Sequence, residues 1–200
     1  MKIDIFGGTV NPIHIGHAII ARCALEHGDL DQLWFMVTPL NPFKKEVAPA
    51  HVTDRDRLLM TQMVARRIPR CSTSAFEFDL PRPSYSVNTL RALREKFPQH
   101  EFSLIIGADN WVAFDRWKDP DEILQHHQVM VYPRLGFDMA LPPSRSSRVT
   151  AIDAPIIEIS STLVRQRAAA GLDVSFLVPD DVLQYIEQNQ LYQPSTLTTP

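Results

Sequence analysis

Two histidines follow a pair of glycines near the start of the chain, and their spacing suits phosphate chemistry. The segment reads Gly7-Gly8-Thr9-Val10-Asn11-Pro12-Ile13-His14-Ile15-Gly16-His17. Adjacent glycines let a ligand approach the backbone closely, and the free N–H groups at the start of the following helix attract an anion. His14 and His17 are three residues apart, which places both imidazoles on one face of a helix. The pattern predicts two hydrogen-bond donors over a phosphate, with Thr9 adding a hydroxyl contact.

The same two histidines could instead be surface residues or metal ligands. A zinc site built on two histidines needs a third ligand, and the chain has no HExxH motif. The glycine pair also belongs to neither a GxGxxG fingerprint nor a Walker A loop. The glycines before the histidines and the helix after them favour an anion site without metal ligation by imidazole.

A second group of polar residues lies near the C-terminus, in the segment Ile159-Ser160-Ser161-Thr162-Leu163-Val164-Arg165. Three hydroxyls at the start of a helix can hold phosphate oxygens together with the exposed N–H groups. Arg165 lies one turn further and can supply a charged fork. Alone, this SSTxxR pattern is a common helix cap. Combined with the first turn, it predicts a second phosphate clamp at the same edge of a sheet.

The elements that must position these groups alternate between strand and helix. Apolar runs and alternation predict strands at 2–6, 33–38, 71–78, 102–106, 128–132 and 155–159. Apolar periodicity predicts helices at 15–27, from Thr53 or Asp54 through 64, at 86–96, 110–116, 120–126, 161–170 and 179–189, the last with Pro179 in its first turn. Residues 136–154 read as a surface loop.

Continuous apolar strands alternating with helices indicate the α/β class. We expect a Rossmann-like, doubly wound parallel sheet of about five to six strands with helices on both faces. Ligands of such sheets bind at the carboxyl ends of the strands, near the point where the strand order reverses. The loops after Phe6, Thr38, Ile106 and Ile159 are therefore the expected site.

Length and composition narrow the class of protein. The chain has 200 residues, which predicts one domain over 1–190 and a loose tail over 191–200. It has no apolar run near the ~18 residues that span a bilayer, and its first residues, with one Lys and a short apolar stretch, are not expected to form a signal peptide. Its net charge of -3 and its lack of a strong basic run argue against nucleic acid and anionic membranes as partners. Two unclustered cysteines, Cys23 and Cys71, predict a cytoplasmic location.

The two motifs together resemble the nucleotidylyltransferase superfamily, whose signature is an HxGH-type turn and a late SSTxxR. Within it, three middle segments are similar to bacterial nicotinate-nucleotide adenylyltransferases. Residues 83–90 (PSYSVNTL) resemble that family's SYTxDTL, residues 107–110 with Trp117 match its GxD…W, and residues 34–44 match its second strand and basic loop. The resemblance spans about 1–190. It departs at Phe43, where many members have His, and at Ser86 and Asn88, which replace Thr and Asp.

The resemblance implies transfer of the AMP moiety of ATP to nicotinate mononucleotide, giving deamido-NAD and pyrophosphate. Mg²⁺ would arrive with ATP. Catalytic roles fall on His14, His17, Lys44 and Arg165, with Lys45 as an alternative to Lys44. The expected ATP contacts are Gly7, Gly8, Thr9, His14, His17, Ile159, Ser160, Ser161, Thr162 and Arg165. The expected mononucleotide contacts are Ser84, Tyr85, Thr89, Gly107, Asp109 and Trp117.

Several of these roles have structural alternatives. Trp117 would stack on the pyridine ring, or it is a core or lid aromatic. Asp109 would bond a ribose hydroxyl, and it could also cap a helix. Ser84 and Tyr85 would form the mononucleotide pocket, or they serve the loop structurally.

Two other functions stay open at this point. A sibling adenylyltransferase would act on nicotinamide mononucleotide or pantetheine phosphate. A nucleotide-binding regulator would keep the pocket without turnover, although the His14/His17 pair and Arg165 argue against it, since a binder needs no transition-state donors. Carboxylate and carboxamide substrates cannot be told apart from the residues alone, and a homo-oligomer also stays open.

Overall fold

The computed structural model describes residues 1–42, 52–138 and 147–193. Within them, six parallel strands form one sheet in the order β3-β2-β1-β4-β5-β6. The strands are β1 (Lys2–Gly8), β2 (Gln32–Val37), β3 (Cys71–Ser74), β4 (Glu101–Gly107), β5 (Val129–Tyr132) and β6 (Val149–Ala151). The strand order reverses at β1, which pairs with β2 on one side and β4 on the other. The carboxyl ends of β1 and β4 are therefore the ligand-binding edge that this topology predicts.

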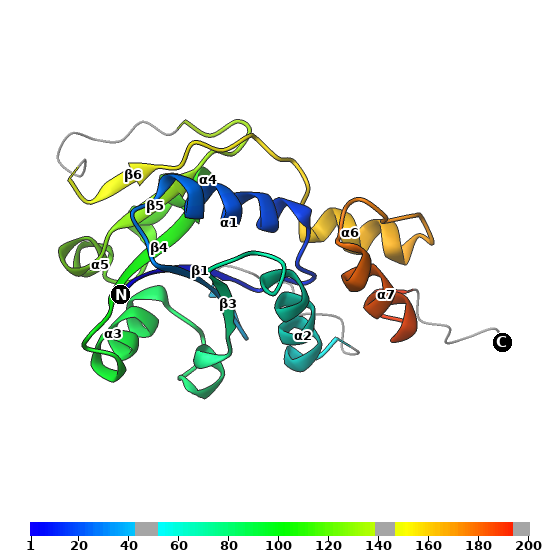
Figure 1. Ribbon diagram of the computed structural model, residues 1–200, viewed down its shortest axis with the longest axis horizontal. Coiled ribbons are helices and arrows are strands. Elements are labelled where there is room, and N and C mark those ends of the chain that lie inside the picture. Colours follow the sequence, from blue (N-terminus) through cyan, green and yellow to red (C-terminus); the bar gives the residue numbers. More distant parts are fainter. Residues whose placement is uncertain (43–51, 139–146, 194–200) are drawn as a thin grey trace.

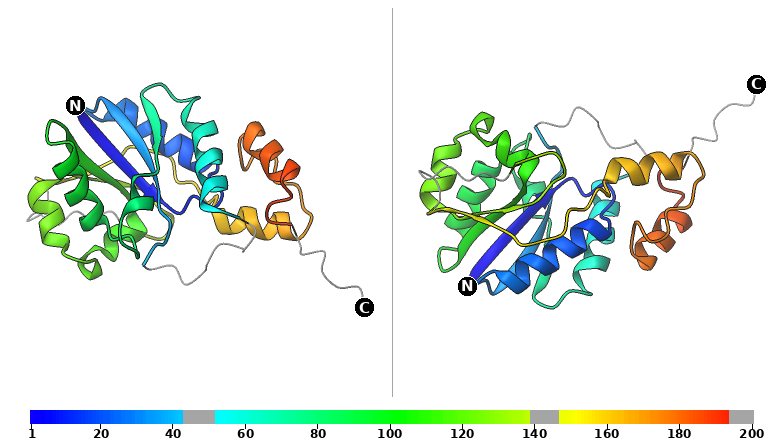
Figure 2. Two further views of the ribbon diagram at one scale, coloured as in Figure 1. Left: turned by 90° about the horizontal axis from the view of Figure 1, so that it is seen from below. Right: turned by 90° about the horizontal axis from the view of Figure 1, so that it is seen from above.

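Helices connect the strands and cover both faces of the sheet (Figure 1). They are α1 (Ile15–His27), α2 (Asp54–Ala65), α3 (Ser86–Lys96), α4 (Ala108–Val112), α5 (Pro120–His126), α6 (Ser161–Ala169) and α7 (Asp180–Gln188), with the 3₁₀ turns η1 (Phe76–Asp79) and η2 (Phe114–Arg116). Figure 2 shows α6 and α7 side by side at one end of the molecule, with α3 and α5 at the other. No helix in the described ranges is both long and apolar enough to cross a membrane. The α/β fold class is confirmed.

Alternating side chains along β1 divide the core in two. Ile3 and Ile5 pack with α3, α4 and α5 on one face, whereas Phe6 packs with α1, α2, α6 and α7 on the other. This is the period of two that a strand buried on both faces requires. The two cores cover the two faces of the sheet around β1, so that loops from both faces can meet over the end of β1.

Two sequence predictions about strands were wrong. The predicted strand 71–78 ends at Ser74 and continues as η1, because the Ser74 hydroxyl accepts the N–H of Phe76 at 3.2 Å and so diverts it from the sheet. The predicted strand 155–159 is absent, and the sixth strand lies instead inside the predicted loop 136–154. Val149 and Ile152 are buried there and attach this segment to β5, whereas Ile156 is exposed.

The predicted loose tail was also wrong at its start. Leu191 and Tyr192 are buried in the core, while 194–200 lie outside the described residues. Pro179 is the N-cap of α7 and not a residue of its first turn. The predicted cap at Thr53 is confirmed, since its hydroxyl accepts the N–H of Asp56 at 3.1 Å.

The carboxyl group of Asp4 lies inside the core. Asp4 is buried on β1, and this burial raises the pKa of its carboxyl from 3.8 to about 6, against a smaller opposing effect of a hydrogen bond from Ser103. The folded state therefore binds the Asp4 proton more tightly than the unfolded chain does. The contribution of protonated Asp4 to the free energy of unfolding is present below pH 4 and is lost as the pH rises through 6.

Candidate active site

A cavity of about 280 Å³ opens over the carboxyl ends of β1 and β4. Its floor includes Gly7, Gly8 and Gly107. His17 and Ser161 line it from the α1 and α6 side, and Tyr85 and Trp117 line it from the α3 side. The size is at the low end for a small-molecule site, and the place is the one that the strand order predicts.

The two histidines have different positions. His14 is the N-cap of α1, and its N–H donates to Nδ1 of His17 at 3.2 Å. A backbone N–H can only donate, so the neutral His17 ring carries its own proton on Nε2. His17 lines both the main cavity and a small depression next to it, whereas His14, only 5% exposed, lines the depression but not the main cavity. The ring centroids lie 3.8 Å apart. Of the two imidazoles, that of His17 therefore reaches the main cavity, and that of His14 packs against it.

Gly16 is the residue that lets His14 take this position. A Cβ at Gly16 would lie 2.9 Å from Nδ1 of His14 and 3.2 Å from a methyl group of Ile157. Both distances are shorter than normal contacts, so only glycine allows the ring to rest against the helix. No role was predicted for Gly16 from the sequence. The HxGH spacing itself was the signal.

Gly7 and Gly8 leave open space. A Cβ at Gly7 would meet no atom within 4 Å, and one at Gly8 would come no closer than 3.8 Å to Val10. Val10 has φ 38°, a left-handed conformation that is costly for a β-branched residue. The turn after β1 thus combines a strained backbone at Val10 with open space beside Gly7 and Gly8, where the cavity lies.

The SSTxxR segment holds that turn in place. Ser160 caps α6 by accepting the N–H of Leu163 at 3.1 Å. Ser161 donates to the carbonyl of Pro12 at 2.8 Å, and Arg165 donates to the carbonyl of Asn11 at 2.9 Å and to Thr162 Oγ1 at 3.3 Å.

Among these described residues, Ser161 alone lines the main cavity, and Ile159 lines the depression beside His14. The segment therefore reaches the site mainly through residues 11 and 12. This leaves the predicted ATP contacts of Ser160, Thr162 and Arg165 as expectations.

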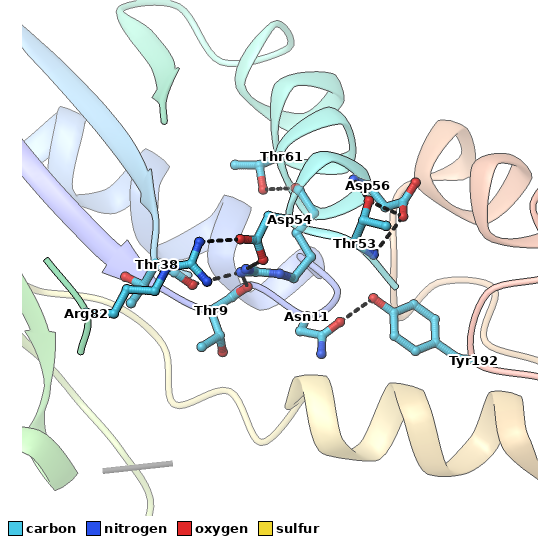
Figure 3. Close-up of polar contacts among 10 residues, drawn as sticks. Thr9, Asn11, Thr38, Thr53, Asp54, Asp56, Thr61, Arg82 and Tyr192 are labelled. Atoms are coloured by element: carbon cyan, nitrogen blue, oxygen red, sulfur yellow. Dashed lines mark hydrogen bonds and ion pairs between the residues drawn. The ribbon is translucent and has the colours of Figure 1, made fainter. Parts of the chain in front are cut away.

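A buried arginine, which the sequence analysis missed, braces the same turn. Arg57 on α2 is 2% exposed and donates to the carbonyls of Thr9 at 2.5 Å and Thr38 at 2.9 Å. Asp54 neutralises it at 2.5 Å and also binds Arg82 at 3.2 Å. Figure 3 shows Thr9, Thr38 and Asp54 converging at the ends of the first two strands. In the sequence Arg57 looks like any polar helix residue, so no local signal could have identified it.

The C-terminal segment contributes a further anchor to the turn. The Tyr192 hydroxyl donates to Oδ1 of Asn11 at 2.6 Å (Figure 3). Burial raises the pKa of Tyr192, so its phenol stays protonated as the donor. Ile15 at the start of α1 donates its N–H to the carbonyl of Leu177 at 3.0 Å. The loop before the histidines is thus fixed by residues far away in the sequence.

The far end of the cavity is aromatic. Trp117 packs on Phe114 with ring centroids 5.2 Å apart, and Tyr85 is the N-cap of α3. The Lys118 ammonium lies 5.1 Å from the Tyr85 ring centre. All six predicted mononucleotide residues line this one cavity.

Two carboxylates lie among those residues. Glu77 is buried, accepts the Thr89 hydroxyl at 2.8 Å, and has its pKa raised by that burial. Asp109 lies 3.7 Å from Arg134 and is not the cap of α4, because Gly107 holds that position. A Cβ at Gly107 would lie 2.3 Å from Oδ1 of Asp109, so glycine makes room for this carboxylate.

Lys44 and Lys45 lie outside the described residues. Across 1–42, 52–138 and 147–193, no group of three or more His, Cys, Asp or Glu side chains is arranged to hold a metal ion.

Comparison with known proteins places the chain in a family. The model of the cytidylyltransferase-like family matches residues 5–167. A probable nicotinate-nucleotide adenylyltransferase of Bacteroides fragilis is 44% identical over 190 residues, which cover 94% of this chain and 92% of the relative. The chain belongs to the nicotinate-nucleotide adenylyltransferase family.

Other relatives agree with this. A probable nicotinate-nucleotide adenylyltransferase of Flavobacterium johnsoniae is 43% identical over 96% of this chain and 100% of the relative. The solved structure of Plasmodium falciparum nicotinic acid mononucleotide adenylyltransferase complexed with NaAD is only 16% identical, yet it shares the fold, with a TM-score of 0.75 over 96% of this chain and 97% of that chain. The resemblance read from the motifs is confirmed.

This member of the nicotinate-nucleotide adenylyltransferase family departs from the family's SYTxDTL at two positions with different settings. Ser86 lines the cavity and keeps a hydroxyl there. Asn88 is not among the lining residues, and its Oδ1 lies 3.5 Å from Arg91 on the same helix. The first change is therefore conservative for the site, and the second falls outside it.

Proposed function

We propose that this chain transfers the adenylyl group of ATP to nicotinate mononucleotide, producing deamido-NAD and pyrophosphate. The observation that carries the proposal is a single cavity with two unlike ends. At one end His17, the glycine turn and Ser161 suit phosphates; at the other Trp117 and Tyr85 suit a flat ring. Membership of the nicotinate-nucleotide adenylyltransferase family supports the same assignment.

The chemistry needs no covalent enzyme intermediate. An oxygen of the mononucleotide 5′-phosphate attacks the α-phosphorus of ATP. The bond from that phosphorus to the α,β-bridging oxygen breaks, and pyrophosphate leaves with the electron pair. The protein's task is to align the two phosphates and to stabilise the charge that develops on the transferring group.

In this reaction the described residues of the site have separate roles. The Nε2–H of His17 donates to a phosphate oxygen at the reacting centre. The turn around Gly7 and Gly8 lets the phosphates approach the backbone. Ser161, Arg57 and Tyr192 keep that turn in position through Pro12, Thr9 and Asn11. Preorganised donors of this kind need no rearrangement during the reaction.

The proposal extends to the groups that the described residues leave open. Lys44 and Arg165 hold the β- and γ-phosphates, and Mg²⁺ enters as the ATP complex, held mainly by phosphate oxygens and water. Trp117 stacks on the pyridine ring and Asp109 binds a ribose hydroxyl. The free thiols of Cys23 and Cys71 support a cytoplasmic setting.

The test is a pyrophosphate-release assay with MgATP and three acceptors: nicotinate mononucleotide, nicotinamide mononucleotide and pantetheine phosphate. We expect deamido-NAD as the main product and the highest kcat/KM for the nicotinate substrate. A higher kcat/KM for either other acceptor would assign the chain to a sibling transferase. Nucleotide binding without turnover would show a regulator.

A further inference from the structure

Among the residues that line the cavity, Lys118 is a cation for which the transfer chemistry above has no use. It follows Trp117 directly in the chain, in the loop between η2 and α5. Its ammonium lies over the Tyr85 ring, 5.1 Å from the ring centre. Tyr85 and Trp117 both pack against the core on the α3 side of the sheet, so Lys118 belongs to the aromatic end of the cavity and not to the phosphate end.

The other charged side chains that line the cavity have partners of their own. Arg134 pairs with Asp109 at 3.7 Å. Glu77 accepts the Thr89 hydroxyl, and burial favours its neutral form by raising its pKa. By contrast, none of the ion pairs among residues 1–42, 52–138 and 147–193 includes Lys118. In the described part of the chain, the ammonium at the aromatic end of the cavity thus has no carboxylate within ion-pair distance.

The arrangement of the two ends of the cavity decides which part of a mononucleotide lies near this ammonium. If the 5′-phosphate lies by His17 and the glycine turn, the ring at the opposite end of the molecule lies between Trp117 and Tyr85. The nicotinate ring carries a carboxylate, whereas the nicotinamide ring carries an uncharged amide. These two substrates therefore differ by one negative charge at the end where Lys118 lies.

We propose that the Lys118 ammonium binds the carboxylate of the nicotinate ring and so is a specificity-determining residue for the acid over the amide. This inference rests on the proposed function and adds a residue for which the transfer chemistry has no need. Lysine suits this role because it carries a compact positive charge at the end of a long side chain, and the Tyr85 ring holds that ammonium beside the cavity. A charge-assisted contact of this kind stabilises the acid and gives the amide no comparable benefit.

The experiment compares kcat/KM for nicotinate and nicotinamide mononucleotide in the wild type, Lys118→Gln and Lys118→Arg. We expect Lys118→Gln to lower the acid-to-amide ratio about tenfold, mainly through KM for the acid, with KM for ATP unchanged. Lys118→Arg should retain most of the ratio because it keeps the charge. In the wild type the ratio should also fall as salt is raised, and in Lys118→Gln it should not.

Lys96 supplies a matched control. Its ammonium also lies over aromatic rings, 5.2 Å from the Phe76 ring centre and 5.8 Å from that of Phe97, but it does not line the cavity. Lys96→Gln should leave the ratio unchanged.

Two results would overturn the inference. An acid-to-amide ratio of kcat/KM in Lys118→Gln within twofold of the wild-type ratio means that the Lys118 ammonium does not bind the carboxylate. An equal fall for both substrates means that Lys118 only supports Tyr85. Either result, with deamido-NAD still formed by the wild type, leaves the proposed function standing. A wild type that forms no deamido-NAD defeats the proposed function itself.

Discussion

Replacing Gly16 with alanine should separate activity from stability. Glycine in a helix is less favourable than alanine by about 0.8–1 kcal/mol, so Gly16→Ala gains helix propensity. The new Cβ would, however, lie 2.9 Å from Nδ1 of His14 and 3.0 Å from its Cε1. Normal contacts begin near 3.4 Å, so the ring must retreat by about 0.5 Å. We therefore expect a free energy of unfolding within about 1 kcal/mol of the wild type.

The same retreat should disturb catalysis. The His14 and His17 rings are in contact, with centroids 3.8 Å apart, and the His14 N–H holds His17 Nδ1. A shift of His14 therefore moves His17 from its position at the cavity. Misplacement of a catalytic group by up to about 1 Å can cost ~100-fold in rate, so we expect kcat to fall by about 10- to 100-fold.

The measurement is steady-state kinetics at saturating MgATP alongside urea denaturation. Arg22→Ala serves as the control, because Arg22 is on the exposed face of the same helix and pairs with Glu26 alone among the described ion pairs. A Gly16→Ala enzyme with wild-type kcat would refute the argument that His14 must rest against Gly16. An enzyme that has lost both stability and activity would show that the strain disrupts the fold rather than the site.

Two further changes test the surroundings of the site and the core. Arg165→Ala should weaken the Kd for MgATP more than that for the mononucleotide, because the guanidinium holds the Asn11 carbonyl behind the phosphate end; equal Kd values for MgATP in calorimetry would refute this. Asp4→Asn should leave stability unchanged at pH 4 and raise it by about 1–3 kcal/mol at pH 8, because ionising a carboxyl whose pKa burial raises from 3.8 to about 6 costs the folded state up to about 3 kcal/mol. Urea denaturation at both pH values measures the difference, and an equal effect at the two would contradict it.

The sequence predicted the parts of the fold that depend on local patterns. Apolar runs such as those around Phe35 and Ile105 predicted the central strands, and the glycine pair predicted a turn that lines the cavity. The three-residue strand at Val149–Ala151 was not predicted, because a segment with a single buried residue shows no hydrophobic periodicity. It forms a strand because β5 lies beside it and pairs with it. The predicted strand at 155–159 was wrong for the converse reason: the segment is apolar, but it pairs with no strand in the described part of the chain.

The same distinction applies to the site. His17 was predicted because the HxGH spacing is a local signal, whereas Trp117 and Tyr85 were predicted from the resemblance of their segments to the family's motifs. Arg57 and Tyr192 were missed because each contacts the first turn from a distant part of the chain. Arg57 donates to a backbone carbonyl, which any residue has, and Tyr192 donates to a side-chain amide oxygen, which several residue types could replace. Their role depends on the fold, so it becomes visible only once the helices are placed around the sheet.

The central claim is that His17 donates to the transferring phosphate, and rapid-quench kinetics of a single turnover tests it most directly. With MgATP and enzyme saturating over nicotinate mononucleotide, His17→Ala should slow adenylyl transfer by about 10²–10³-fold. Its Kd for the mononucleotide and its free energy of unfolding should stay near wild type. The exposed His126, which does not line the cavity, provides the matched control, and His126→Ala should react at the wild-type rate. A His17→Ala enzyme within threefold of that rate would contradict the account.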